Sequence, residues 1–223
     1  MANKLYGQYC GLAKALDRIG ERWTLLIIRD LYFGPRRFSD LEEGLRGISA
    51  SVLTERLNGL EHERLVIRRT LPPPAASKVY ELTQDGQELA RAMIPLAAWG
   101  VRLLAANRRK RTEAFRPAWG FLYLRETFDA ASARGVHDVY EFHIDGSVIS
   151  VIVDDGEMQV IEGQTGRAVD VEIYVDETTF IDVGVGRVRG RDAIREGKLK
   201  LAGSEAALRR YSRIVRPLAP ARA

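Results

Sequence analysis

The first half of the chain repeats apolar residues with the period of an α-helix. They recur in two consecutive segments, 12–20 and 21–34, and Gly34-Pro35 marks the end of the second. Ser39 is a candidate N-cap for the next helix because Glu42 follows three residues later, the spacing of a capping box. The pattern therefore predicts a mostly helical first half.

Residues 49–62 form the most informative helical segment. On a helical wheel, Leu53, Leu57 and Leu60 share one face, and Ser49 is a candidate N-cap. The opposite face is polar, with Thr54 on its flank; it holds Ser51, Glu55, Asn58 and His62. We expect the leucine face to pack inward, but a polar outer face by itself is also typical of any surface helix in a bundle.

The pattern changes to alternation after residue 64. Residues 65–71 and 77–83 read as two strands joined by the triple proline 72–74, which predicts a hairpin with a stiff tip. Thr83 and Asp85 then introduce a long helix, in which Pro95 predicts a kink.

The order of these elements favours DNA binding over an ordinary helix bundle. A short helix, a tight turn, a polar-faced helix and a basic hairpin form a helix-turn-helix followed by a wing, whose second helix enters the major groove. Ser, Thr and Asn suit base readout, and hairpin cations suit phosphates. The predicted DNA-binding residues are Arg36, Arg37, Ser39, Ser49, Ser51, Thr54, Glu55, Asn58, Arg68, Arg69 and Lys78.

Glu55 fits this surface least well, because phosphates repel a carboxylate. We expect it either to accept a hydrogen bond from a cytosine amino group or to orient a nearby arginine such as Arg56 or Arg36.

The segments 9–41, 47–69 and 78–90, in this order and spacing, resemble the HxlR family of bacterial winged-helix regulators. The resemblance covers residues 9–105. It implies a homodimer whose paired recognition helices enter successive major grooves of a two-fold-related site. It also implies that the first helix and the helix after the wing form the dimer interface.

Cys10 is the one cysteine, which excludes an internal disulfide. The family commonly has Cys-Pro at this place, whereas this chain has Cys10-Gly11, and in some members the cysteine senses oxidants or electrophiles. A sensing thiol must be accessible and partly ionised. We favour an unreactive, buried structural cysteine, since free cysteines are usually buried, and keep redox sensing as the alternative.

The second half has a different texture. Residues 107–117 are charged and end in proline, which indicates a linker, and 119–133 is a helix candidate. Residues 139–163 read as three short strands joined by the Asp-Gly turns 145–146 and 155–156. Further along, the pattern predicts a strand at 168–176, helices at 177–187 and 191–197, a strand at 198–203 and, after Ser204, a helix at 205–215.

Residues 137–213 resemble the sterol-carrier family through Glu177, Thr179 and Phe180, then Gly197, Leu199 and Gly203, and then the helix after Ser204. The resemblance implies an α+β domain with an antiparallel sheet and an apolar tunnel. Its predicted lining residues could equally fill an ordinary core. They are Trp119, Phe121, Phe128, Phe142, Ile144, Ile173, Phe180 and Leu199.

Charge separates the two halves. The chain carries a net charge of +4, but residues 1–112 hold 19 Lys/Arg against 12 Asp/Glu, and residues 113–223 hold 15 against 18. The basic surplus of the first half favours a polyanion partner. His62, His137 and His143 are scattered, and no catalytic set is recognisable, so we expect no metal, no cofactor and no enzymatic activity.

Together these patterns predict an α+β protein with two domains: a winged helix-turn-helix for DNA binding and dimerisation at 1–108, and a sterol-carrier-like antiparallel-sheet domain at 117–216. We expect a cytoplasmic homodimeric regulator of double-stranded DNA, modulated by a hydrophobic small molecule, with no membrane partner. The alternative is a hydrophobic-ligand carrier or scaffold whose winged helix mediates protein contacts. An enzyme that uses the carrier-like domain as a binding module is a third, weaker hypothesis.

Overall fold

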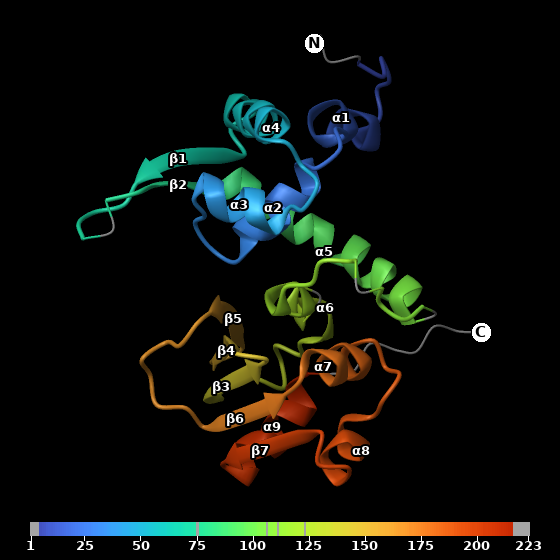
Figure 1. Cartoon of the computed structure of the whole chain (residues 1–223), viewed down its shortest axis with the longest axis vertical. Helices are drawn as coiled ribbons and strands as arrows, with labels where there is room; N and C mark the ends of the chain where they lie inside the picture. Colours follow the sequence, from blue (N-terminus) through green and yellow to red (C-terminus); the bar gives the residue numbers. More distant parts are fainter. Residues whose placement is uncertain (1–4, 75, 106, 111, 123, 216–223) are drawn as a thin grey trace. The chain divides into compact units, whose positions relative to one another are not determined.

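The computed structural model describes residues 5–74, 76–105, 107–110, 112–122 and 124–215 (Figure 1). The chain forms two compact units, Met1–Met93 and Ile94–Ala223. The predicted domains 1–108 and 117–216 include a few positions outside the described residues: 1–4, 75, 106, 123 and 216. Within the described residues, no helix combines the length and apolar character that crossing a membrane requires.

The first unit is a helical domain with a hairpin. Its elements, in chain order, are α1 (Gly11–Ile19), α2 (Thr24–Tyr32), α3 (Phe38–Gly44), α4 (Ala50–His62), β1 (Val66–Thr70), β2 (Lys78–Leu82) and α5 (Gln84–Ala105), which continues into the second unit. β1 and β2 pair antiparallel, as the alternating pattern predicts. Pro95 lies inside α5, which is helical on both sides of it.

The core of the first unit is built on the leucine stripe of α4. Leu53, Leu57 and Leu60 are at most 2% exposed and pack with apolar residues of α2, α3 and the hairpin. The Ser49 hydroxyl accepts a hydrogen bond from the Val52 N–H, at 3.3 Å, so the predicted cap is confirmed. Burial of this stripe fixes which face of α4 remains available to solvent.

The predicted cap of α3 is wrong. The helix begins at Phe38, so Ser39 lies within its first turn rather than before it. The Arg37 N–H instead donates to the Asp40 carboxylate, at 2.9 Å. Asp40 caps the helix because it stands three residues after Arg37, where its carboxylate can reach back to the free N–H groups at the helix start.

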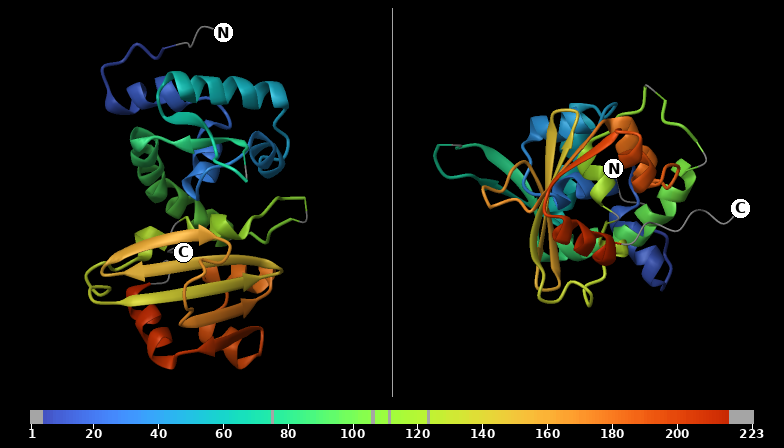
Figure 2. Two further views of the ribbon diagram at one scale, coloured as in Figure 1. Left: turned by 90° about the vertical axis from the view of Figure 1, so that its left-hand side faces the viewer. Right: turned by 90° about the horizontal axis from the view of Figure 1, so that it is seen from below.

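The second unit is a five-stranded sheet with helices on one face (Figure 2). The strands follow the order β5-β4-β3-β6-β7. In chain order the elements are η1 (Pro117–Phe121), α6 (Leu124–Thr127), β3 (His137–Ile144), β4 (Ser147–Asp154), β5 (Glu157–Glu162), β6 (Val171–Val175), α7 (Glu177–Gly184), α8 (Gly190–Arg195), β7 (Leu199–Gly203) and α9 (Glu205–Ile214).

The sheet is mixed, not purely antiparallel as the sequence suggested. β3, β4 and β5 form the predicted meander, and both Asp-Gly turns have positive φ at each residue. β6, however, lies parallel to β3 on the other side. The connection 163–170 makes this arrangement because it returns along the face of the sheet away from the helices, as Figure 2 shows, before β6 begins.

Two predictions for residues 107–133 need correction. The helix expected at 119–133 is broken into η1 and α6, with turns after them. The segment expected to be a linker is held by the second unit: Arg109 pairs with Glu177 at the start of α7, and the rings of Phe115 and Phe180 lie 6.2 Å apart. These contacts make the residues after α5 part of the second unit.

Candidate DNA-binding surface and ligand cavity

The exposed face of α4 presents a row of small polar side chains. The hydroxyls of Ser49 and Ser51 are 3.0 Å apart, and Thr54 Oγ1 donates to the Ala50 carbonyl at 2.8 Å. Asn58 is exposed, and its side chain forms no hydrogen bond within the described residues. The face thus offers donor and acceptor groups that a base edge can use.

Glu55 is held by the residue next to it. Arg56 Nη1 lies 3.1 Å from the Glu55 carboxylate and its Nη2 lies 3.0 Å from Glu21. Arg56 Nε also donates to the Arg22 carbonyl, and its side chain is only 18% exposed. Arg56 therefore fastens α4 to the residues before α2, and Glu55 serves this anchor rather than standing as a lone carboxylate.

The predicted phosphate-binding cations divide into engaged and free groups. Arg36 Nε donates to the Asp30 carbonyl, Arg37 Nε to the Ser77 hydroxyl, and both Nε and Nη2 of Arg69 to Glu81. Arg68 and Lys78, on the two strands of the wing, are exposed and have no ion pair in the described part of the chain. Among the cations of the hairpin, Arg68 and Lys78 are therefore the ones whose charge is least neutralised by nearby acidic groups.

Cys10 is exposed, which corrects the expectation of a buried structural thiol. It stands at the N-cap position of α1, where the backbone N–H groups of Ala13 and Leu12 lower the pKa of its thiol. A cysteine at the start of a helix is ordinarily more acidic for this reason.

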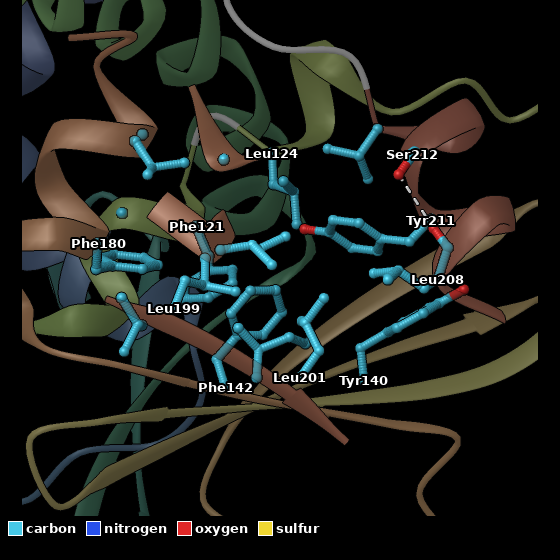
Figure 3. A pocket seen from close by; sticks show the side chains of 18 of the residues that line it. Phe121, Leu124, Tyr140, Phe142, Phe180, Leu199, Leu201, Leu208, Tyr211 and Ser212 are labelled. Atoms are coloured by element: carbon cyan, nitrogen blue, oxygen red, sulfur yellow. Dashed lines mark hydrogen bonds between the residues drawn. The ribbon is translucent and has the colours of Figure 1, made fainter. Parts of the chain in front are cut away.

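The second unit contains a partly open apolar cavity of about 450 Å³ between the sheet and its helices (Figure 3). Alternate residues of β3, β6 and β7 point into it from the sheet, and residues of η1, α7, α8 and α9 close the other sides. Five of the predicted residues line it: Phe121, Phe142, Ile173, Phe180 and Leu199.

Three predicted lining residues lie elsewhere. Ile144 is buried at the end of β3, Trp119 is half-buried in η1, and Phe128 forms a backbone bridge with Val215. Residues that the sequence analysis did not select include Tyr140, Leu201, Leu208 and Tyr211, which Figure 3 shows around the same space. Strand alternation would have given Tyr140 from Phe142 and Leu201 from Leu199.

Gly120 allows one wall of the cavity to form. A Cβ at this position would lie 2.5 Å from the ring of Phe180. The Phe180 ring instead stacks on Phe121, with centroids 5.4 Å apart, and Phe121 meets Phe142 edge to face. Because Gly120 has no side chain, the three aromatic rings can pack together and connect η1, α7 and the sheet.

A polar cluster fixes α9 to the sheet beside the cavity. Arg210 forms two hydrogen bonds of 2.7 Å with Asp138, and the Tyr140 hydroxyl donates to the same carboxylate and to the Ala207 carbonyl. The Arg210 guanidinium lowers the pKa of Asp138, whereas burial raises the pKa of Tyr140. Of the described residues that line the cavity, one is charged: Arg191.

The end of α5 is tied to the cavity wall. Arg187, between α7 and α8, donates to the carbonyls of Leu104 and Asn107, at 2.7 and 2.5 Å, and pairs with Asp182 of α7. These carbonyls would otherwise be left over at a helix end. α7, which supplies Phe180 and Val183 to the cavity, is therefore bonded to the helix that also belongs to the first unit.

Comparison with known proteins agrees with this geometry. Residues 18–108 match the HxlR-like helix-turn-helix model, and the chain is 36% identical over 88 residues to the HTH-type transcriptional regulator YodB of Bacillus subtilis. That alignment covers 40% of this chain and 79% of YodB. The chain belongs to the HxlR-like helix-turn-helix family. Residues 123–216 match the model of the SCP-2 sterol transfer family.

Two further comparisons cover a similar part of the chain. The chain is 37% identical over 100 residues, 45% of its length, to an uncharacterized HTH-type transcriptional regulator of Mycobacterium tuberculosis, and spans 61% of that relative. The solved structure of reduced YodB superposes with a TM-score of 0.39 and 33% identity, over 45% of this chain and 99% of YodB. These curated relatives are transcriptional regulators, as expected from the winged helix-turn-helix.

Proposed function

We propose that the protein is a ligand-responsive transcriptional regulator that binds DNA as a homodimer. The observation that carries the proposal is the exposed polar face of α4, flanked by the free cations Arg68 and Lys78 of the wing. Ser51, Thr54 and Asn58 would read base edges, and the wing cations would bind phosphates. The family membership of residues 18–108 supports the same assignment.

Exposed apolar residues support a dimer. In α1, Leu12 is 69% and Leu16 36% exposed, and in α5 Trp99 is 56% and Leu103 54% exposed. Large apolar side chains at helical spacing on two helices are typical of a surface that a partner covers. A second copy of the chain would bury them and present two α4 helices to a two-fold-related site.

The effector we propose is a hydrophobic molecule with one anionic or polar end. The cavity offers aromatic and aliphatic walls, which favour an apolar body, and Arg191 offers a guanidinium for the polar end. Effector binding would move α7, and the bonds of Arg187 to the end of α5 would carry this movement to the shared helix. Coupling then requires that the effector bind the two conformations with different affinity.

Binding to DNA tests the regulator assignment. A bound sequence is first selected from a random double-stranded pool, and its affinity is then measured by fluorescence anisotropy at physiological salt. We expect specific binding at least a thousandfold tighter than to unrelated DNA. Equal and weak affinity for all sequences would contradict the proposal.

A hydrophobic carrier or scaffold is the second candidate, and the cavity is the observation that favours it. In that case the wild-type protein would retain an apolar molecule, seen by native mass spectrometry, but would show no sequence preference on DNA.

The exposed Cys10 thiol is a second proposed site of regulation, because its lowered pKa favours reaction with electrophiles. Cys10→Ser would then abolish any change in DNA affinity caused by diamide.

A further inference from the structure

The outer face of the sheet, opposite the cavity, carries a cluster of metal-ligating side chains. Glu141 and His143 stand two residues apart on β3 and therefore share one face. In the parallel pairing of β3 with β6, Glu172 is the partner of Glu141 and Tyr174 the partner of His143. The neighbouring residues Tyr140, Phe142 and Ile173 face the cavity instead. The pairing of β3 with β6 thus places two carboxylates beside His143, although no metal site was expected there.

The three ligand groups converge on one point. One nitrogen or oxygen atom from each of Glu141, His143 and Glu172 lies within 4.8 Å of the other two. His143 Nε2 is 3.4 Å from a Glu141 oxygen. Ligands about 2 Å from a common tetrahedral metal ion lie roughly 3.3 Å apart, so the side chains would have to move inward to complete the site.

The cluster holds buried negative charge that no neighbouring cation in the described residues neutralises. The Glu141 side chain is 4% exposed, and His143 Nε2 is buried without a hydrogen-bond partner. Within the described residues, no Lys or Arg is paired with Glu141 or Glu172. A divalent cation would offset the charge of both carboxylates and bind the Nε2 lone pair.

A second layer of contacts holds the ligands in place. The Tyr174 hydroxyl donates to Glu172 Oε2 at 2.7 Å, and its ring stacks on His143 with centroids 4.5 Å apart and planes inclined by 12°. Tyr174 thus positions a carboxylate ligand and an imidazole ligand together. Such outer contacts orient metal ligands and commonly affect metal affinity tenfold or more.

We propose that Glu141, His143 and Glu172 bind a divalent first-row transition-metal ion, with Zn²⁺ as the ion that this ligand set fits. An imidazole with two carboxylates suits Zn²⁺ better than Mg²⁺ or Ca²⁺, which prefer oxygen ligands throughout. Three protein ligands leave a coordination position for water or another small ligand. The ion would link β3 to β6, the two strands that supply Phe142 and Ile173 to the cavity on the other face.

The test uses full-length protein freed of metal by a chelator, in a Cys10→Ser background that removes the exposed thiol as a competing ligand. Isothermal titration with ZnCl₂ should give one ion per chain and a Kd in the micromolar range or below. Titration with MgCl₂ should give at least a hundredfold weaker binding. The chain should also unfold at a higher temperature with Zn²⁺ present, because the ion binds the folded state.

Variants locate the site. His143→Gln and Glu172→Gln should each weaken Zn²⁺ binding at least tenfold, and Tyr174→Phe should weaken it less. His137→Gln is the matched control: His137 lies at the other end of β3, exposed and paired with Asp154, and its loss should leave the affinity unchanged. Circular dichroism checks that each variant is folded.

A spectroscopic measurement keeps the proposal testable if a ligand variant fails to fold. Co²⁺ bound at the site should give visible absorption bands in the wild-type background, and Tyr174→Phe, which keeps every ligand, should alter them. Absence of one-to-one binding in the Cys10→Ser protein would overturn the proposal. Zn²⁺ affinity that is the same in folded His143→Gln, Glu172→Gln and the parent would overturn it as well.

Discussion

The two functional regions of this protein are built in opposite ways. In α4, apolar residues are buried and the polar face is left at the surface, so the candidate site consists of what packing does not use. In the second unit, apolar residues face a space that protein atoms do not fill. The first kind of site follows from periodicity along one helix, whereas the second is a space that the side chains of several strands and helices leave unfilled. Substitutions in α4 and in the cavity should therefore affect stability and binding to different extents.

The largest expected effect is on the buried side of α4. Leu57→Ala should lower the free energy of unfolding by about 3 kcal/mol, because a side chain that is 1% exposed leaves a cavity. The neighbouring Asn58→Ala should change it by less than about 0.5 kcal/mol, since surface substitutions rarely matter more. Denaturant titration measures both.

The same pair of variants separates packing from readout. Asn58→Ala should reduce the preference for the selected sequence by about 1–3 kcal/mol, the range for loss of a base contact. If Asn58→Ala kept both affinity and preference, α4 would be an ordinary surface helix. If it destabilised the fold as much as Leu57→Ala, the division of α4 into two faces would be wrong.

The next effect concerns the cluster that holds α9 against the sheet. Arg210→Ala should destabilise the protein by about 2–3 kcal/mol, because the buried Asp138 carboxylate loses its partner. Arg210 lowers the folded-state pKa of Asp138, so this stabilisation is present above the unfolded pKa, about 3.9. It is lost as pH falls from that value through the lower folded pKa.

Thermal unfolding between pH 7 and pH 2 checks the sign of this prediction. The wild-type protein should lose stability toward acid more steeply than Arg210→Ala. The matched control is Arg209→Ala, because Arg209 forms an exposed pair with Glu205 on the same helix, 69% and 87% exposed, and should change little. Parallel pH curves for wild type and Arg210→Ala would contradict the assigned cause of the Asp138 shift.

Filling the cavity should have a smaller effect on stability and should mainly weaken ligand binding. Leu201→Trp places a larger side chain into the space that Figure 3 shows and should weaken binding of a fluorescent fatty-acid probe at least tenfold. Overpacking should cost about 1–3 kcal/mol of stability. DNA affinity of the ligand-free protein should be unchanged.

Ala202→Trp is the control for cavity filling. Ala202 is the next residue of β7, is exposed, and by strand alternation points to the opposite face. It should leave probe binding intact. Equal loss of probe binding in both variants would show that the probe does not enter the cavity between the sheet and the helices.

The sequence predicted the first unit more completely than the second for physical reasons. The α4 stripe and the β1-β2 hairpin depend on neighbours in the chain, so local periodicity was sufficient. The parallel placement of β6 and the contacts of Arg109 and Phe115 with α7 depend on residues distant in sequence. Ser39 is not the cap of α3 because the Asp40 carboxylate accepts a hydrogen bond from the Arg37 N–H, and the helix begins at Phe38.

The candidate sites show the same limit. Strand alternation was enough to find Phe142 and Ile173, but not to tell that Ile144 fills the core instead of facing the cavity. The outer cluster was missed because Glu172 meets Glu141 through a parallel register that no local pattern indicates. The division of the wing cations into paired and free groups likewise depends on where Glu81 falls across the hairpin.

That division gives the smallest and most discriminating prediction. Arg68 and Arg69 are adjacent on β1, but Arg69 already shares its charge with Glu81, at 2.6 Å, whereas Arg68 is exposed and unpaired within the described residues. Arg68→Ala should therefore weaken DNA binding about equally for all sequences and make the slope of log K against log salt shallower by about 1. Arg69→Ala should have a smaller effect on both quantities, because phosphate binding by Arg69 must first compete with its ion pair. Anisotropy titrations at several salt concentrations compare the two variants. Equal effects would show that Glu81 leaves Arg69 on binding DNA, and a loss of sequence preference in Arg68→Ala would mean that the wing contacts bases as well as phosphates.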